Sequence, residues 1–150
     1  MADVAVRQAL PEDLDALLSL YRELADTRSH AAPGDPASSA PLLAQILADP
    51  ARLLVVAELD GRLVGSADLL VVPNLTYHGR PWAIVENVVV SARRRGVGRA
   101  LFEHLIEHAR SAGCFKLQLL SGSQRTGAHR FYGEIGLQAL AEGFRLYFDS

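Results

Sequence analysis

The chain is poor in several residue types and has no long apolar run. Its 150 residues include one cysteine, one methionine and one tryptophan. A single cysteine excludes an internal disulfide, and the first residues lack the basic, apolar and small-residue order of a secretory signal, so we expect a reducing, cytoplasmic location. The longest apolar runs, such as residues 53–57 and 88–90, are far shorter than the about 20 residues that cross a bilayer. We therefore expect no membrane partner.

The chain also lacks an excess of either charge. Fifteen Lys and Arg residues stand against 17 Asp and Glu residues, which gives a formal net charge of −2. Proteins that bind nucleic acids usually present a positive field, so we expect no nucleic-acid partner. With 49% hydrophobic and 21% charged residues, the chain has enough apolar material for one core. We expect residues 1–150 to form a single domain.

Strand and helix patterns alternate along the chain. Runs of strand-forming residues predict strands at residues 4–7, 53–58, 63–72, 82–90, 115–120 and 144–148. Apolar residues at helical spacing predict helices beginning at Pro11, Leu42, Gly98 and near Thr126. Asp60-Gly61 predicts a two-residue hairpin, and the prolines of residues 29–41 predict a loop. This order predicts a central mixed sheet with helices on its faces and one parallel crossover between residues 82 and 120.

Glycines and arginines follow the strand predicted at residues 82–90. Four arginines surround Gly96 and Gly98, where the next helix begins: Arg93, Arg94, Arg95 and Arg99. Glycines between a strand and a helix permit a sharp bend and leave the first helical N–H groups pointing outward, which suits a phosphate or pyrophosphate. The alternative is that the arginines only form a solvated helix start.

Two common phosphate-binding motifs are excluded. The chain has no Gly-x-x-x-x-Gly-Lys-Ser/Thr sequence, which excludes the P-loop NTPases. Leu101 stands where the dinucleotide fingerprint needs a third small residue, and the position where that fingerprint has its ribose-binding acid falls near Gln118. Dinucleotide binding is therefore disfavoured.

Three blocks of sequence resemble one family over nearly the whole chain. Residues 93–98 match Arg-x-x-Gly-x-Gly after the Val-Glu-Asn-Val strand at residues 85–88. Residues 128–137 read Ala-His-Arg-Phe-Tyr-Gly-Glu-Ile-Gly-Leu, and the chain opens with Val-Arg-Gln-Ala at residues 6–9, followed by Asp13 and Leu14. Together these blocks resemble the GCN5-related N-acetyltransferase (GNAT) superfamily. The resemblance implies an α/β (α+β mixed) fold, with a mostly antiparallel twisted sheet of about six to seven strands flanked by about four helices.

The resemblance also implies a cosubstrate and the residues that hold it. The cosubstrate would be acetyl-coenzyme A, with its pyrophosphate at the glycine turn, and no metal would be needed. The residues expected to hold it are Val88, Val89, Val90, Arg93, Arg94, Arg95, Gly96, Val97, Gly98, Arg99, Ala100, Ser121 and His129. His129 lies just outside the apolar stripe of its helix, so a surface position without a role is the alternative. The family also has a strand bulge beside the thioester, which implies that the Val88 N–H meets the developing oxyanion.

Two residues are candidate catalysts. An ammonium must lose a proton before its nitrogen can attack a thioester, and Glu86 is the candidate base because it is a carboxylate in an otherwise apolar strand. The alternative is a structural pairing of Glu86 with an arginine. Tyr132 matches the family's tyrosine that protonates the leaving thiolate. Its place in the apolar stripe of residues 128–135 is also typical of a core residue, and the two roles are compatible.

Two other features are interpreted as non-catalytic. Residues 104–108 read His-Leu-Ile-Glu-His, which fits a zinc-peptidase motif, but the apolar stripe of that helix leaves both histidines on its solvated side. Cys114 has no base at a recognisable spacing, so a covalent acyl-enzyme is disfavoured.

The resemblance therefore implies direct transfer of an acetyl group to a primary amine of a small molecule in a ternary complex. Three alternatives stay open: a longer acyl donor, a protein amine as acceptor, and an acyl-CoA-binding sensor or interaction module without turnover. We expect residues 29–41 and 74–81 to shape the acceptor site. Its charges do not choose the acceptor, because Asp68 and Glu86 would attract a cation and Arg80 an anion. A homodimer is a further expectation.

Overall fold

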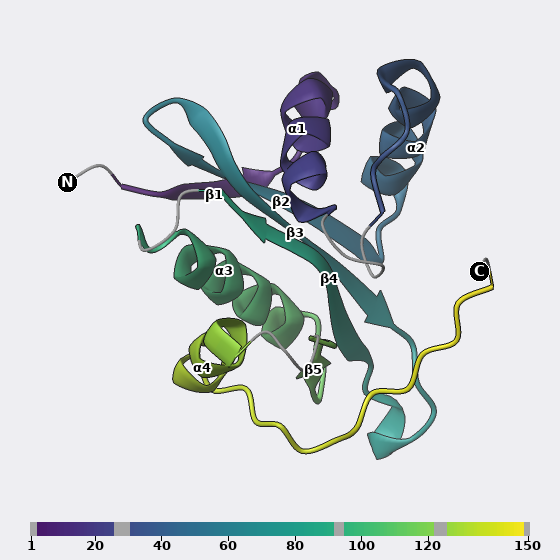
Figure 1. Ribbon diagram of the computed structural model, residues 1–150. Coiled ribbons are helices and arrows are strands. Elements are labelled where there is room, and N and C mark those ends of the chain that lie inside the picture. The colour runs from purple at the N-terminus through teal and green to yellow at the C-terminus, as the bar shows by residue number, and fades with distance from the viewer. Residues whose placement is uncertain (1–2, 26–30, 92–94, 122–125, 149–150) are drawn as a thin grey trace. The chain divides into compact units, whose positions relative to one another are not determined.

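The computed structural model describes residues 3–25, 31–91, 95–121 and 126–148. The chain forms two compact units, Met1–Gln118 and Leu119–Ser150. The first contains all five strands of the described residues and the helices α1, α2 and α3, and the second contains α4 (Figure 1). The mixed α/β architecture predicted from the sequence is confirmed.

The strands β2 (Arg52–Leu59) and β3 (Arg62–Val72) form the hairpin predicted from Asp60-Gly61. Asp60 and Gly61 have φ values of 54° and 74°. Two consecutive residues with positive φ make a turn whose twist matches the twist of the paired strands. The hairpin therefore fixes the register of two long, buried strands of the sheet.

The sheet is mixed and has the order β1-β2-β3-β4-β5. The strand β1 (Ala5–Gln8) pairs antiparallel with β2, and β4 (Trp82–Val90) pairs antiparallel with β3. The short strand β5 (Leu117–Gln118) lies parallel to β4. The predicted parallel crossover is confirmed. The prediction of six to seven strands is wrong for the described residues, where five are found, and β5 is shorter than the strand predicted at 115–120.

The predicted terminal strand at residues 144–148 is also wrong. This segment has no strand pairing among the described residues, although its apolar residues alternate as in a strand. Phe144, Leu146 and Phe148 are 89%, 79% and 95% exposed. A strand needs a neighbour that satisfies its backbone groups, and an alternating pattern alone does not supply one.

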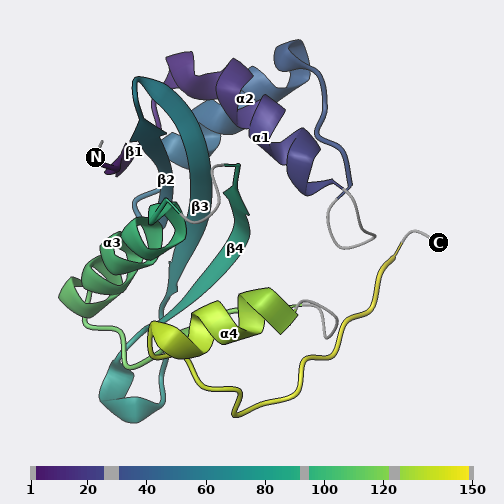
Figure 2. The ribbon, with the colours of Figure 1, turned by 60° about the vertical axis from the view of Figure 1, so that its left-hand side comes forward.

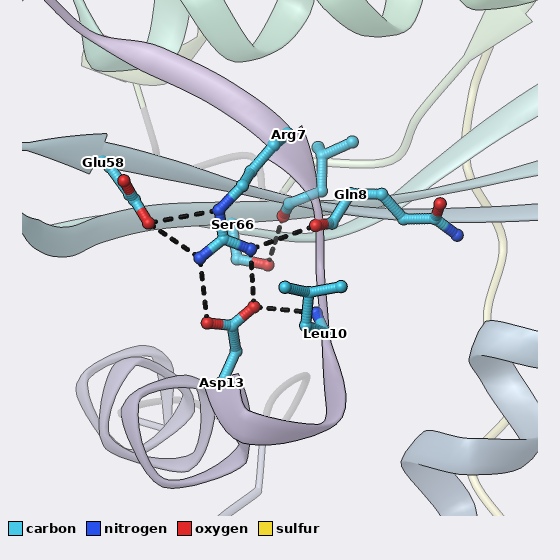
Figure 3. A network of polar contacts seen from close by, with 7 residues as sticks. Arg7, Gln8, Leu10, Asp13, Glu58 and Ser66 are labelled. Atoms are coloured by element: carbon cyan, nitrogen blue, oxygen red, sulfur yellow. Dashed lines mark hydrogen bonds and ion pairs between the residues drawn. The ribbon is translucent and has the colours of Figure 1, made fainter.

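A charged network fixes the first helical turns against the sheet. The 3-10 helix η1 (Pro11–Asp13) leads directly into α1 (Leu14–Leu24). Asp13 is buried and accepts hydrogen bonds from the Arg7 guanidinium at 2.8 and 3.0 Å and from the Leu10 N–H at 2.7 Å (Figure 3). The same guanidinium donates to Glu58 on β2 at 2.7 Å, which connects η1, β1 and β2.

The helix α2 (Pro36–Ala48) is longer than predicted. The prolines of residues 29–41 predicted a loop, but Pro36 occupies the first helical turn, where its fixed φ and missing N–H are favourable. Asp35 caps this helix by accepting a hydrogen bond from the Ser38 N–H at 2.8 Å. The predicted loop therefore extends only to Asp35, and its residues 29 and 30 lie outside the described part of the chain.

Helices cover both faces of the sheet in the first unit. α1 and α2 lie on one face, and α3 (Val97–Ser111) lies on the other (Figures 1 and 2). The apolar stripe of α3 is buried as predicted, with Leu101, Phe102 and Leu105 fully enclosed. Gly113 adopts a φ of 82° just after α3 ends, the left-handed conformation in which glycine commonly ends a helix. In the described part of the chain, none of the helices combines the length and the apolar character needed to cross a bilayer.

Candidate active site

A bulge interrupts β4 at the position where the resemblance implies one. Asp68 of β3 is paired with Glu86, and Ser66 is paired with Val89, so two steps along β3 correspond to three along β4. The extra residue lies within Asn87-Val88, and Asn87 has a φ of 53°. Asparagine tolerates this left-handed conformation better than most residues with a side chain. The predicted bulge at Val88 is therefore confirmed.

The bulge changes which side chains share a face of the sheet. In a regular strand, Glu86, Val88 and Val90 would share one face, as the sequence alone predicts. Because Ser66 and Asp68 are two residues apart on β3, their partners Val89 and Glu86 instead share a face. This is the face of α1, because Ser66 and Asp68 both act on the pKa of Tyr21 of that helix. The predicted alternation is wrong beyond Asn87, since the bulge inserts one residue.

The last half of β4 has no paired strand on its β5 side within the described part of the first unit. Pairing with β5 ends at Ile84 and Gln118, whereas β4 continues to Val90. Val88 and Val90 are half-buried, and Val89 is buried against the α1 face. An unpaired strand edge offers backbone N–H and C=O groups to a ligand that runs alongside it.

The turn after β4 presents the first amides of α3. Gly96 is the N-cap residue, has a φ of 78°, and supplies no side-chain hydrogen bond to the helix. The first N–H groups of a helix have no carbonyl partner within it and carry partial positive charge. Arg95 and Arg99 are exposed beside them, while Gly98 and Ala100 are half-buried. Arg93 and Arg94 lie outside the described residues.

Val97 connects this turn to the core. The whole residue is 1% exposed, so its side chain belongs to the core. Gly65 of β3 lies directly beneath it, because a Cβ placed on Gly65 would come within 2.8 Å of a Val97 methyl group. The first turn of α3 is therefore seated on a sheet position that only glycine accommodates.

Glu86 is exposed on the α1 face of the sheet, directly opposite Asp68 on β3. Among the described residues, no hydrogen bond or ion pair involves its carboxylate. The alternative of a structural arginine partner therefore finds no support in this part of the chain. An exposed carboxylate beside a bulged strand can accept a proton from a bound amine.

A buried polar cluster next to Glu86 was not predicted from the sequence. The Arg52 Nε donates to Asp68 Oδ1 at 2.9 Å, and a second guanidinium nitrogen donates to Oδ2. Burial raises the pKa of Tyr21, and the negative charge of Asp68 adds to this rise. Hydrogen bonding to Asp68 raises the pKa of Arg52 further above its already high value. The sequence does contain a sign of this cluster: Asp68 is an acid in the buried strand at 63–72, and a buried acid requires a partner.

The second unit carries the remaining candidates. α4 (Thr126–Glu134) holds Tyr132, which is half-buried, and His129, which is exposed. The rings of Phe131 and Tyr132 lie 5.7 Å apart between centroids. Ser121 has a buried Oγ with no hydrogen-bond partner among the described residues. A buried hydroxyl of this kind is suited to a ligand's polar group.

Four other residues singled out by sequence motifs or charge have different surroundings. His104 and His108 are exposed as predicted, and the described residues contain no group of three ligands suited to a metal ion. Burial raises the pKa of the Cys114 thiol, which makes it a poor nucleophile. Arg80 donates to the carbonyl oxygens of Gly113 and Cys114 at 3.1 and 3.0 Å. These contacts give Arg80 a structural role in the turn after α3.

Comparison with known proteins agrees with this arrangement. A family model described as the acetyltransferase (GNAT) family matches residues 15–137. Glucosamine 6-phosphate N-acetyltransferase from Trypanosoma brucei brucei is 41% identical over 88 residues, which cover 57% of this chain and 58% of that protein. The match thus spans somewhat more than half of that relative.

Two solved structures are similar over nearly their whole length. An acetyltransferase from Trypanosoma brucei has a TM-score of 0.81 at 32% identity, covering 97% of this chain and 99% of that one. A protein described as a transcriptional regulator from Bacillus halodurans C-125 has a TM-score of 0.86 at 31% identity, covering 97% and 100%.

Proposed function

Because the chain belongs to the acetyltransferase (GNAT) family, as its sequence resemblance predicted, we propose that it is an acetyl-CoA-dependent N-acetyltransferase. The reaction would move the acetyl group to a primary amine of a small molecule by direct attack in a ternary complex. The observation that carries this proposal is the bulged, partly unpaired β4 leading into the glycine-capped start of α3. The family match runs through both compact units, which supports one acetyltransferase domain over residues 1–150.

Residues around the β4–α3 turn would hold acetyl-CoA. The first amides of α3, at Val97, Gly98 and Arg99, suit its pyrophosphate, and the exposed Arg95 and Arg99 add positive charge. The turn at Gly96 is open to a ligand, because nothing lies within 4 Å of a Cβ built there. Arg93 and Arg94 remain candidates on sequence grounds.

The unpaired edge of β4 would align the pantetheine arm. The backbone of residues 88–90 offers hydrogen-bonding groups there, and the Val88 N–H would meet the developing oxyanion. In the second unit, the Ser121 hydroxyl and His129 are further candidate contacts. When bound, acetyl-CoA supplies an activated acyl group whose carbonyl carbon accepts the amine.

Glu86 would act as the base. A primary ammonium with a pKa of about 10 has no free lone pair at neutral pH, so it must first lose a proton, directly or through water, to a nearby acceptor. The exposed carboxylate of Glu86 suits this role. The nitrogen then forms the new amide bond as the carbon–sulfur bond breaks, and coenzyme A leaves as a thiolate. Tyr132, with the higher pKa of a phenol, would give that thiolate its proton.

The acceptor is proposed to be a small molecule with a primary amine. The Trypanosoma brucei brucei relative is named for glucosamine 6-phosphate, an amine of this kind. Arg80 donates to the carbonyl oxygens of Gly113 and Cys114, and the exposed Glu86 supplies a negative charge for the amine end of such an acceptor. A protein amine or a longer acyl donor would use the same β4–α3 machinery.

A sensor without turnover is the second candidate function. The similarity to the structure described as a transcriptional regulator favours testing it. Such a protein would bind acyl-CoA at the same turn and would release no thiol.

The chain is further proposed to form a homodimer. The exposed row Phe144, Leu146 and Phe148 supports this, because such a row loses contact with water when a partner covers it. Light scattering coupled to size exclusion would report a doubled mass, and Leu146→Lys would return the mass to that of a monomer.

Calorimetry with coenzyme A and a thiol-release assay over a panel of amines test the enzymatic proposal together. Binding of coenzyme A with thiol release on at least one amine supports the enzyme. Binding with no release on any amine favours the sensor. The variant Glu86→Gln would lose turnover at limiting amine and keep coenzyme A affinity; an unchanged rate would remove Glu86 as the base.

A further inference from the structure

Two carboxylates face each other beside the proposed base site. Asp68 and Glu86 are directly opposed residues of the antiparallel pair β3–β4, and they lie on the α1 face of the sheet. Side chains at such positions have their Cβ atoms about 4.5–5.5 Å apart, and like charges there repel one another. Asp68 is 5% exposed, so little water screens its charge. A bare Asp68 would make Glu86 harder to ionise.

Arg52 removes this repulsion. It stands on β2, two residues before Leu54, the residue that pairs with Asp68, so it approaches Asp68 diagonally on the same face. Its guanidinium contacts both carboxylate oxygens, with the Nε at 2.9 Å from Oδ1. This two-point geometry is the strongest form of an arginine–carboxylate contact. The charge of Asp68 is thus largely cancelled where it faces Glu86.

Three other polar groups lie near this pair: Asp49, whose negative charge acts on Arg52, and the neutral Tyr21 and Ser66. Tyr21 of α1 lies within electrostatic reach of both Asp68 and Arg52, and burial, by raising its pKa, keeps its hydroxyl protonated at neutral pH. Ser66, on the same face, donates its hydroxyl hydrogen to the Val55 carbonyl oxygen at 2.8 Å. Among the described residues, the charged groups facing Glu86 across the strands are therefore Asp68 on β3 and Arg52 on β2.

We infer that Arg52 and Asp68 form a positioning pair for Glu86, in which the arginine cancels the charge of Asp68 and so keeps Glu86 an available proton acceptor. This inference rests on the proposed function of Glu86 and adds to it a control over when that residue can accept a proton. Neither member of the pair needs to contact a substrate.

The pair predicts shifts of opposite sign from its two halves. Removing the positive charge with Arg52→Gln leaves the Asp68 carboxylate without its compensating cation, so the Glu86 midpoint should rise. Removing the negative charge with Asp68→Asn leaves an uncompensated guanidinium, so the Glu86 midpoint should fall. A purely structural pair would change stability in both variants and would not shift Glu86 in opposite directions.

The direct measurement is an NMR titration of the Glu86 side-chain carboxyl carbon in protein labelled with 13C-glutamate. The Glu86→Gln variant assigns the resonance by its disappearance. The double variant Arg52→Gln/Asp68→Asn should return the midpoint close to that of the unmodified protein. Arg52→Lys keeps the charge and should leave the midpoint in place, and Arg62→Gln, an exposed arginine on β3, is the matched control.

Midpoints that move in opposite directions in Arg52→Gln and Asp68→Asn support the inference. Midpoints that stay in place, or move in the same direction, overturn it. If Arg52→Gln does not fold, Asp68→Asn and Arg52→Lys alone decide, since one must lower the midpoint and the other must preserve it. The titration needs no turnover, so an inactive protein with opposite shifts would refute the proposed function and leave the pair intact. In an active enzyme, the acid limb of kcat/KM should move with the same signs.

Discussion

Arg7 donates two parallel hydrogen bonds to the buried carboxylate of Asp13, at 2.8 and 3.0 Å (Figure 3). The same carboxylate receives the Leu10 N–H at 2.7 Å, so it connects β1 to the turn that starts α1. Hydrogen bonding from Arg7 is the main cause of the lowered pKa of Asp13. This contact is distant in sequence from the proposed catalytic residues, and we expect it to stabilise the fold.

Asp13→Asn should lower the free energy of unfolding by about 1–3 kcal/mol, because the charge-assisted acceptor is lost while Arg7 stays in place. The folded pKa of Asp13 lies below its unfolded value, so its contribution is fully present above about pH 4 and is lost as pH falls below that. Urea unfolding between pH 3 and 7 measures both effects. Glu12→Gln, at the exposed neighbouring acid, is the control and should change stability by less than about 0.5 kcal/mol. Equal losses in both variants would contradict the assignment.

Gly96→Ala should weaken acetyl-CoA binding and also cost about 1 kcal/mol of stability, because an alanine is strained at a φ of 78°. Gly61→Ala is a closely matched control, since Gly61 has a φ of 74° and a Cβ at that position would also have nothing within 4 Å. Both variants should lose similar stability in thermal unfolding. Only Gly96→Ala should show a reduced thermal shift on adding coenzyme A, and a similar reduction in Gly61→Ala would argue against a binding role for the α3 turn.

Tyr132→Phe should lower kcat by about 10–100-fold with little change in coenzyme A affinity, because the variant keeps the ring and loses the proton donor. Steady-state kinetics on an accepted amine, combined with calorimetry, measures the two quantities. Tyr147→Phe, at a tyrosine near the C-terminus that is 38% exposed, is the control and should keep full turnover. Full turnover in Tyr132→Phe would end its assignment as the acid.

Cys114 should react slowly with iodoacetamide at about pH 7.5, because burial raises the pKa of its thiol and reduces the thiolate fraction. Mass spectrometry over time, compared with the urea-unfolded protein, gives the ratio of rates. Cys114→Ser should retain activity. Loss of turnover in that variant, or an acetylated Cys114 after incubation with acetyl-CoA, would instead point to a covalent intermediate.

Local signals in the sequence predicted much of the sheet and of the candidate site. Asp60-Gly61 predicted its hairpin because two residues that tolerate positive φ strongly favour that turn. The strand at 82–90 and the glycine turn before α3 were predicted because their residues need little tertiary context. The family resemblance implied the bulge at Val88. The regular alternation of side chains along the strand gave no sign of it.

Contacts between residues far apart in the sequence were harder to predict. The Arg52–Asp68 contact joins residues 16 apart and depends on the hairpin register. The helix at residues 36–48 was predicted too short because its prolines were interpreted as loop residues. The first helical turn accepts Pro36, and Pro41 lies inside the helix. Residues 144–148 have the alternation of a strand, but a strand is defined by a neighbour that the sequence does not specify.

The bulge at Asn87 also separates the framework of the fold from the shape of the strand edge. Deleting Asn87 would leave two steps along β4 opposite two along β3, so Val89 would still pair with Ser66 and Val90 with Gly65. The polypeptide would then enter α3 in phase, and Val97 would still lie above Gly65. A single-codon deletion here should therefore keep the fold and straighten only the strand edge beside Val88, so it should harm acetyl transfer more than stability.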